Sequence, residues 1–398
     1  MKRWVIAGLL LLVTMINYTD RMTLSVLVGD IRANLSLSET DYSQVISLFL
    51  VAYAIMYAGS GYIVDRLGTR LGMAFFVFTW SISQMLHGAA RGKWGLGLCR
   101  FFLGLTEPGS FPAATKAVGE WFSPAERGIG VGIFNAGSSL GAAVAAPLAA
   151  WLGIRYGWRA AFVFTGALGL VWLLLWLTIY SPGPIVHKTN ERANWRRVLA
   201  SRECLLLILA RFLSDPVIYF IVFWFPAYLA KERGFDLKKI GEFAWIPYVF
   251  GDVGYVFGGW LSSRFMKLGK NVGKSRKIAM GLGAALLPLA IFAPLAPTAS
   301  IAIAVTCVIV LGHAIWIANL MTLPTDLFPP WEVGTAAGLS GMGGAIGGAL
   351  ANLATGYVVS HYAYMPMFIW AGVMHPLAFL LIWRYLSVPE VVNNHSLQ

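Results

Sequence analysis

Residues 4–28 read WVIAGLLLLVTMINYTDRMTLSVLV, a mostly apolar run that is long enough to cross a bilayer as a helix. The run nevertheless contains Asp20 and Arg21, two adjacent and opposite charges. A charge at the bilayer centre costs about 2.5–3.5 kcal/mol on insertion scales, so such residues face a bundle interior or a wet cavity. The stretch therefore predicts a membrane helix that lines a polar pathway.

The composition of the whole chain agrees with a membrane protein. Of its 398 residues, 58% are hydrophobic and 12% are charged, and the mean hydropathy is +0.68. The strand alternation of a β-barrel is absent, so we expect helices, which satisfy their own backbone hydrogen bonds in lipid. We predict an all-α integral membrane protein with twelve transmembrane helices at 4–28, 42–64, 72–90, 94–120, 127–152, 158–180, 203–229, 241–262, 276–295, 299–325, 333–360 and 364–387.

The net charge of +12 does not indicate a nucleic-acid partner, because most of the basic residues fall in loops on one side of the predicted membrane. By the positive-inside rule, this bias places both termini in the cytoplasm. The first segment is too long for a signal-peptide core and is read as an uncleaved span. We expect a multi-pass protein of a bacterial inner (plasma) membrane. Cys99, Cys204 and Cys307 lie in apolar segments, which predicts neither a disulfide nor a metal site.

The second half of the chain repeats the first. At a spacing of 206 positions, Glu120 pairs with Asp326, Phe122 with Phe328, Pro124 with Pro330, Glu126 with Glu332, Gly128 with Gly334, Gly132 with Gly338, Gly137 with Gly343 and Gly141 with Gly347. A weaker match, at a spacing of 198, sets residues 61–66 against 259–264. We predict two pseudo-symmetric six-helix halves, 1–180 and 203–398, joined by a cytoplasmic linker at 181–202. Parallel repeats of this kind are typical of transporters, and the repeated glycines indicate close helix packing.

Several motifs carry a family resemblance over essentially the whole chain. Residues 61–70 (GYIVDRLGTR) resemble the signature loop of the major facilitator superfamily. Residues 17–21 (NYTDR), 107–116 (EPGSFPAATK) and 132–139 (GIFNAGSS) resemble its anion:cation symporter family. The pattern from His313 to Asp326, with Arg211 and Asp215, is similar to the hexuronate transporter branch, although Ala314 and Ile317 depart from it.

The intramembrane charges predict a mechanism. At 1.5 Å per helical residue, Arg21 and Arg100 lie at similar depth, and Glu107 lies two turns from Arg100 on the same face. We expect Arg21 to bind a substrate carboxylate, since its planar fork matches both oxygens. We expect Tyr18 and Tyr53 to assist Arg21 in binding the substrate carboxylate. The expected proton-coupling residues are Asp20, Glu107 and Arg100. A static ion pair between Asp20 and Arg21 is the alternative.

The resemblance implies further roles. Candidates for contacting sugar hydroxyls and the ring face are Asn135, Tyr219, His313, Trp316 and Asn319. The candidate cytoplasmic gate comprises Asp65, Arg66, Arg70 and Arg127. For Arg211 and Asp215, which lie four residues apart, a static helical ion pair is the favoured interpretation.

Together these features predict a proton-coupled symporter that imports a hexuronate, galacturonate or glucuronate, by alternating access. It would act as a monomer in the lipid bilayer, with a sugar acid anion and protons as partners and no nucleic acid. No nucleophile, metal or cofactor motif indicates an enzyme, and no cofactor is expected. The alternatives are a symporter for an aldonate, glucarate or aromatic acid, and a membrane sensor of sugar acids that carries no flux.

Overall fold

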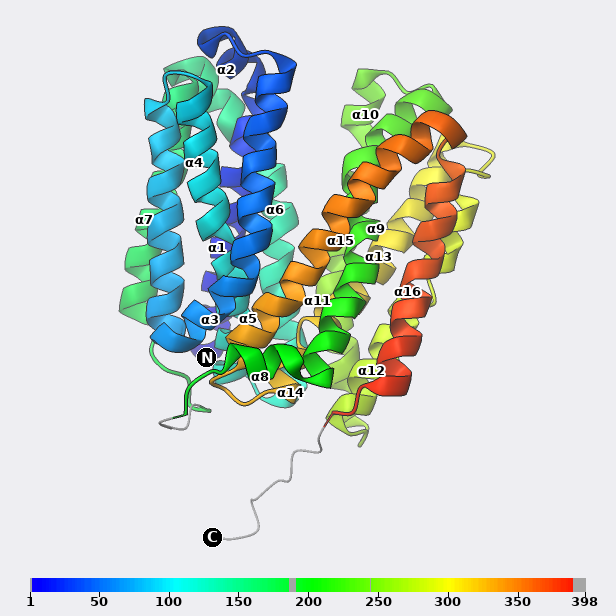
Figure 1. The fold of residues 1–398 in the computed structure, drawn as a ribbon. Coiled ribbons are helices and arrows are strands. Elements are labelled where there is room, and N and C mark those ends of the chain that lie inside the picture. The colour runs from blue at the N-terminus through cyan, green and yellow to red at the C-terminus, as the bar shows by residue number, and fades with distance from the viewer. Residues whose placement is uncertain (1, 186–190, 244, 389–398) are drawn as a thin grey trace. The chain divides into compact units, whose positions relative to one another are not determined.

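The computed structural model describes residues 2–185, 191–243 and 245–388, and all regular elements in these ranges are helices (Figure 1). The earlier elements are α1 (Lys2–Val26), α2 (Val28–Leu35), α3 (Glu39–Leu86), η1 (His87–Ala89), α4 (Lys93–Thr106), η2 (Glu107–Gly109), α5 (Ser110–Trp121), α6 (Pro124–Tyr156) and α7 (Trp158–Ile179). The later ones are α8 (Trp195–Ala200), α9 (Arg202–Arg233), α10 (Leu237–Phe243), α11 (Ile246–Lys267), α12 (Val272–Ala284), η3 (Leu287–Phe292), α13 (Ala299–Leu320), α14 (Leu323–Leu327), α15 (Val333–Tyr362) and α16 (Met365–Tyr385).

Local sequence explains where several helices begin and break. Ser38 and Asp41 form a capping box at the start of α3, which satisfies backbone N–H groups of the first turn. The predicted spans 42–64 and 72–90 both lie in α3, which is interrupted at Gly68, with φ 76° and ψ 160°, a backbone conformation that favours glycine. The predicted span 94–120 is not continuous, because Pro108, which lacks an N–H, falls in the short helix η2 between α4 and α5.

Within the described residues, nine helices are long and apolar enough to cross a membrane, judged by length and composition. Many of their large apolar side chains are exposed, among them Ile55, Leu174 and Leu353, as expected of surfaces that face lipid. The all-helical fold class is therefore confirmed, while the count of twelve spans stays a prediction.

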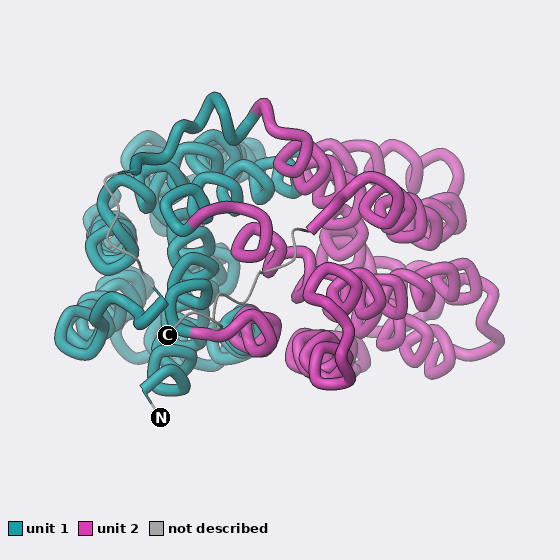
Figure 2. Tube along the Cα trace, turned by 90° about the horizontal axis from the view of Figure 1, so that it is seen from below, with its two compact units in different colours: residues 1–121, 133–199, 330–346 teal, residues 122–132, 200–329, 347–398 magenta. Residues whose placement is uncertain are grey.

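The chain forms two compact units (Figure 2). Unit 1 contains residues 1–121, 133–199 and 330–346, and unit 2 contains residues 122–132, 200–329 and 347–398. A core that includes Leu24, Leu96 and Phe162 fills part of unit 1. The core of unit 2 includes Phe220 and Phe368, whose rings meet edge to face. Each unit thus includes a short segment from the other part of the sequence, and the predicted division into six-helix halves stays a prediction.

The repeated glycines allow helices to touch at equivalent places in the two units. In unit 1, a Cβ added to Gly61 on α3 would lie 1.9 Å from the carbonyl oxygen of Gly334 on α15. In unit 2, a Cβ added to Gly259 on α11 would lie 2.2 Å from the carbonyl oxygen of Gly128 on α6. These residues match in the repeat, so the predicted close packing is confirmed at both crossings.

Candidate functional site

In unit 1, Arg21 lies between a carboxylate and three aromatic rings. Its Nε and Nη2 atoms donate to Oε2 of Glu107 at 3.1 and 3.0 Å. Its guanidinium carbon lies 4.9 Å from the ring centre of Tyr18, 4.7 Å from Tyr53 and 5.5 Å from Phe49, distances at which ring faces attract a cation. The Arg21 side chain is 19% exposed and that of Glu107 is fully buried, so a ligand reaches the guanidinium first. Phe49 is an addition that the sequence does not single out.

Asp20 and Arg100 lie close to the Arg21–Glu107 pair, but several of their hydrogen-bonding atoms have no partner among the described residues. Asp20 is fully buried, and neither of its carboxylate oxygens has a hydrogen-bond partner among the described residues. Arg100 is 3% exposed, and its Nε and Nη2 atoms also lack partners within that part of the chain. The groups interact electrostatically with each other and with Glu107. The alternative of a static Asp20–Arg21 pair is therefore wrong, because Arg21 pairs with Glu107.

Asp20 is surrounded by polar residues that the sequence does not single out. Gln84 on α3 donates to the backbone oxygen of Asp20 at 3.1 Å and to Oγ1 of Thr165 at 3.0 Å. Trp80 lies next to the same carboxylate. Both Gln84 and Trp80 are fully buried. A polar amide inside the apolar span 72–90 was the available signal, since a buried amide has to find partners.

In unit 2, the predicted residues of α13 have different surroundings. His313 Nδ1 lies 3.0 Å from Nε2 of His375 on α16, and the ring of His375 meets that of Trp316 edge to face at 5.7 Å. Asn319 is fully buried, and its Nδ2 donates to the backbone oxygens of Gly258 and Ile315, both at 3.0 Å. Asn319 therefore joins α13 to α11. Its predicted contact with a sugar stays a prediction.

The remaining predicted substrate residues lie on separate elements. Tyr219, on α9 in unit 2, stacks on Phe223 with ring centres 6.1 Å apart, and Asn135 lies on α6 in unit 1, where it is 5% exposed. Arg211 and Asp215 on α9 form the expected ion pair, with a closest N–O distance of 2.6 Å. The structure thus places Tyr219 and the ion pair on one helix.

Among the predicted gate residues, Asp65 holds the start of α15 within unit 1. Its carboxylate accepts from the backbone N–H groups of Gly334 and Thr335, at 3.1 and 2.6 Å. Lys116 donates to the same carboxylate at 2.6 Å. A carboxylate at the first turn of a helix also complements the helix dipole. Asp65 therefore stabilises a junction between segments that are far apart in the sequence.

The other gate candidates are not gathered around Asp65. Arg66 donates to the hydroxyl of Tyr62, and Arg70 donates to the backbone oxygen of Leu177. Near Arg70, the buried Glu120 accepts from the hydroxyls of Thr69 and Tyr180; these three residues come from α3, α5 and the end of α7.

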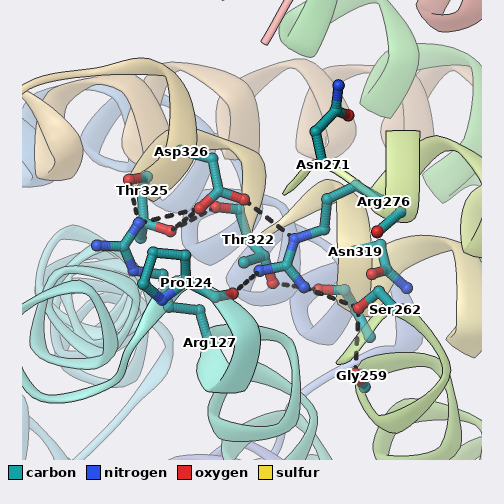
Figure 3. A network of polar contacts seen from close by, with 12 residues as sticks. Pro124, Arg127, Gly259, Ser262, Asn271, Arg276, Asn319, Thr322, Thr325 and Asp326 are labelled. Atoms are coloured by element: carbon teal, nitrogen blue, oxygen red, sulfur yellow. Dashed lines mark hydrogen bonds and ion pairs between the residues drawn. The ribbon is translucent and has the colours of Figure 1, made fainter. Parts of the chain in front are cut away.

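Arg127 lies in unit 2, in a network centred on Asp326 (Figure 3). Arg127 Nη1 donates to Asp326 Oδ1 and Arg276 Nε donates to Asp326 Oδ2, both at 3.0 Å. Arg276 also donates to the hydroxyl of Ser262 and to the backbone oxygen of Pro124, both at 2.8 Å. Both oxygens of this buried carboxylate are therefore paired with arginines.

Comparison with known proteins decides the family. Residues 10–351 match the model of the Major Facilitator Superfamily. The chain belongs to the Major Facilitator Superfamily. Solved members share its fold: the proton:xylose symporter XylE has a TM-score of 0.79 at 16% identity, covering 98% of this chain and 96% of the other. FucP, solved in the outward conformation, has a TM-score of 0.78 at 14% identity, covering 98% and 100%.

Relatives within the superfamily confirm the resemblance to the hexuronate branch. The hexuronate transporter of Escherichia coli (strain K12) is 33% identical over 406 residues, which cover 97% of this chain and 94% of the relative. The galacturonate transporter of Dickeya chrysanthemi is 35% identical over 306 residues, which cover 72% and 89%. The probable galactarate/D-glucarate transporter GudP of Escherichia coli (strain K12) is 28% identical, covering 90% and 87%. The chain is thus a multi-pass membrane transporter and not an enzyme.

Proposed function

We propose that this transporter imports a hexuronate, galacturonate or glucuronate, together with protons. The substrate class is supported by the hexuronate and galacturonate transporters among its relatives. The single structural observation that carries the proposal is the Arg21 side chain, which is 19% exposed and lies between Tyr18 and Tyr53. Its carboxylate partner, Glu107, belongs to the protein itself. A sugar carboxylate offers the same chemistry as Glu107 and accepts two parallel hydrogen bonds from an arginine fork.

The proposed coupling follows from competition for Arg21. A proton that binds Glu107 removes the negative charge that holds the guanidinium, and Arg21 then pairs with the carboxylate of the substrate. Asp20 provides a second proton site, since its oxygens lack hydrogen-bond partners in the described chain. Arg100, whose Nε and Nη2 are likewise unpaired there, favours the ionised form of Glu107 after the proton leaves. Substrate binding and protonation then support each other, as symport requires.

We assign the sugar hydroxyls and ring face to the candidates named from the sequence, namely Asn135, Tyr219, His313, Trp316 and Asn319. Asp65, Arg66, Arg70 and Arg127 remain the proposed cytoplasmic gate of an alternating-access cycle. The protein would work as a monomer in a bacterial inner membrane with both termini in the cytoplasm.

A dicarboxylate such as glucarate is a second candidate substrate. The galactarate/D-glucarate transporter among the relatives supports it. The unpaired nitrogens of Arg100 offer a second site for a carboxylate close to Arg21. Uptake competition between the two acids separates these substrates.

The test is transport by the purified protein in proteoliposomes. We expect labelled galacturonate to accumulate against its gradient when the outside is acidic, and a protonophore to abolish the accumulation. Unlabelled glucuronate should compete at lower concentration than glucarate, galactonate or an aromatic acid. Competition by glucarate at much lower concentration would favour the second candidate. Binding without any flux would instead indicate a sensor.

A further inference from the structure

Two buried imidazoles face each other in unit 2. His313 on α13 and His375 on α16 have ring centres 5.2 Å apart with an interplanar angle of 77°. The 3.0 Å separation of His313 Nδ1 and His375 Nε2 is a hydrogen-bond distance. A neutral imidazole carries a proton on one nitrogen and accepts at the other, so this contact holds one shared proton. The direction of the bond decides what the two outer nitrogens offer.

The environment of His375 sets that direction. His375 is fully buried, and its Nδ1 has no hydrogen-bond partner among the described residues. A buried N–H without a partner is rarer in proteins than an acceptor that is incompletely satisfied. Nδ1 is therefore the bare nitrogen, and the proton of His375 lies on Nε2, from which it donates to His313. His313 must then carry its own proton on Nε2.

The charged groups near the pair leave it neutral. Arg211 and Asp215 of α9 act electrostatically on His313, but they are paired with each other at 2.6 Å. Their charges largely cancel at His313. The helix η3, which packs against both α13 and α16, contributes no ionisable side chain.

We propose that His375 is a positioning residue that fixes His313 as a neutral donor, with its Nε2–H directed to a hydroxyl or ring oxygen of the sugar acid. His313 keeps 3% of its surface accessible while His375 keeps none, so His313 is the member that a ligand meets. The inference rests on the proposed function and deepens it. An uncharged donor adds recognition of the sugar without adding a cation that would attract the carboxylate.

Nitrogen NMR of histidine-labelled protein in nanodiscs tests the tautomer without any substrate. We expect the His313 signals to show a protonated Nε2 and a bare Nδ1, and His375 to show the same pattern. The signals are assigned by their loss in His313→Gln and His375→Gln. A protonated Nδ1 on His313 would overturn the inference and leave the proposed function untouched.

Binding of galacturonate, measured by calorimetry, tests the consequence. His375→Phe keeps a ring beside Trp316 but loses the donor, and we expect about a tenfold weaker affinity. His375→Gln restores an N–H donor to His313 Nδ1 and should recover most of the loss. The matched control is His361→Phe, because His361 is an exposed histidine on α15.

The same variants separate the inference from the proposed function. Parent-like affinity in His375→Phe, or no recovery in His375→Gln when both variants melt like the parent, would refute the positioning role. Should the parent bind no hexuronate at all, the proposed function fails, and the NMR pattern still decides the tautomer.

Discussion

Glu107 in unit 1 and Asp326 in unit 2 are both buried carboxylates held by arginine, yet their surroundings differ. Asp326 has a guanidinium on each oxygen, from Arg127 and Arg276. Glu107 has Arg21 on one oxygen, and its other oxygen lacks a partner among the described residues. We call the network around Asp326 closed, because both carboxylate oxygens accept from arginines. We call the cluster around Glu107 open, because one carboxylate oxygen has no donor among the described residues.

The contrast shows that buried charge by itself does not mark a coupling residue. A closed network gains nothing from a proton or a ligand, because its acceptors are already used, and breaking it leaves an uncompensated charge. An open cluster has atoms to spare for a proton, a water molecule or a substrate. The unpaired oxygens of Asp20 place it with Glu107 in the open class.

The strongest test of this contrast is Arg276→Met. The substitution leaves one oxygen of Asp326 unpaired and removes the donor to Pro124 and Ser262, so we expect a loss of about 3–5 kcal/mol in the free energy of unfolding. Thermal melting in detergent measures it. Lys274→Met, an exposed position on the same helix α12, is the control and should melt like the parent. Equal melting of the two variants would show that the closed network carries no stability.

Arg21→Lys probes the open cluster and should affect binding instead of stability. Lysine keeps the charge but offers a compact ammonium in place of a two-pronged fork. We expect hexuronate affinity to fall about a hundredfold by calorimetry, with a melting temperature near that of the parent. A neutral sugar of the same size should bind poorly to both proteins. Near-normal affinity in the variant would make Arg100 the leading carboxylate site.

Glu107→Gln should separate transport from its energy source. Glutamine resembles the protonated acid but cannot release a proton, and a ligand shifts a conformational equilibrium only through its different affinity for the two states. We expect counterflow of labelled substrate to persist in liposomes while uphill, proton-driven accumulation is lost. Asp20→Asn should lose accumulation as well, with weaker binding. Parent-like accumulation by the Glu107→Gln protein, dissipated by a protonophore, would remove Glu107 from the proton pathway.

The smallest effect is expected for Glu120→Gln. Glu120 matches Asp326 in the repeat, but its oxygens accept from two hydroxyls, those of Thr69 and Tyr180. A glutamine keeps one acceptor and can donate to the other hydroxyl, so the unfolding free energy should change by about 1 kcal/mol or less. A loss of unfolding free energy as large as that of Arg276→Met would show that the hydrogen bonds from the two hydroxyls depend on the negative charge of Glu120.

The sequence predicted the helices and the glycine crossings well, because both depend on local pattern. Apolar runs mark the helices, and the repeat aligns Gly61 with Gly259 and Gly128 with Gly334. The break at Pro108 was missed, because the flanking residues continue the apolar pattern. Breaks of this kind are decided by the backbone and not by hydropathy.

The sequence predicted which residues form the candidate site, but not which of them pair with one another. The sequence pointed to Arg21, Tyr18, Tyr53 and Glu107. That Arg21 pairs with Glu107 and not with Asp20 depends on the direction in which each side chain leaves its helix. Adjacent residues on a helix do not face each other. His375 lies 62 positions from His313, and a single sequence contains no signal that joins them.

The two glycine crossings also bear on how this protein can evolve. Gly259 meets Gly128, and Gly61 meets Gly334, so each compact unit is completed by a segment encoded in the opposite half of the gene. If the two halves descend from one duplicated ancestor, a substitution at either crossing would disturb packing that involves both copies. A bulky substitution at Gly128 is felt in unit 2, and one at Gly334 is felt in unit 1. Selection on the packing at these crossings therefore acts on both halves of the chain together.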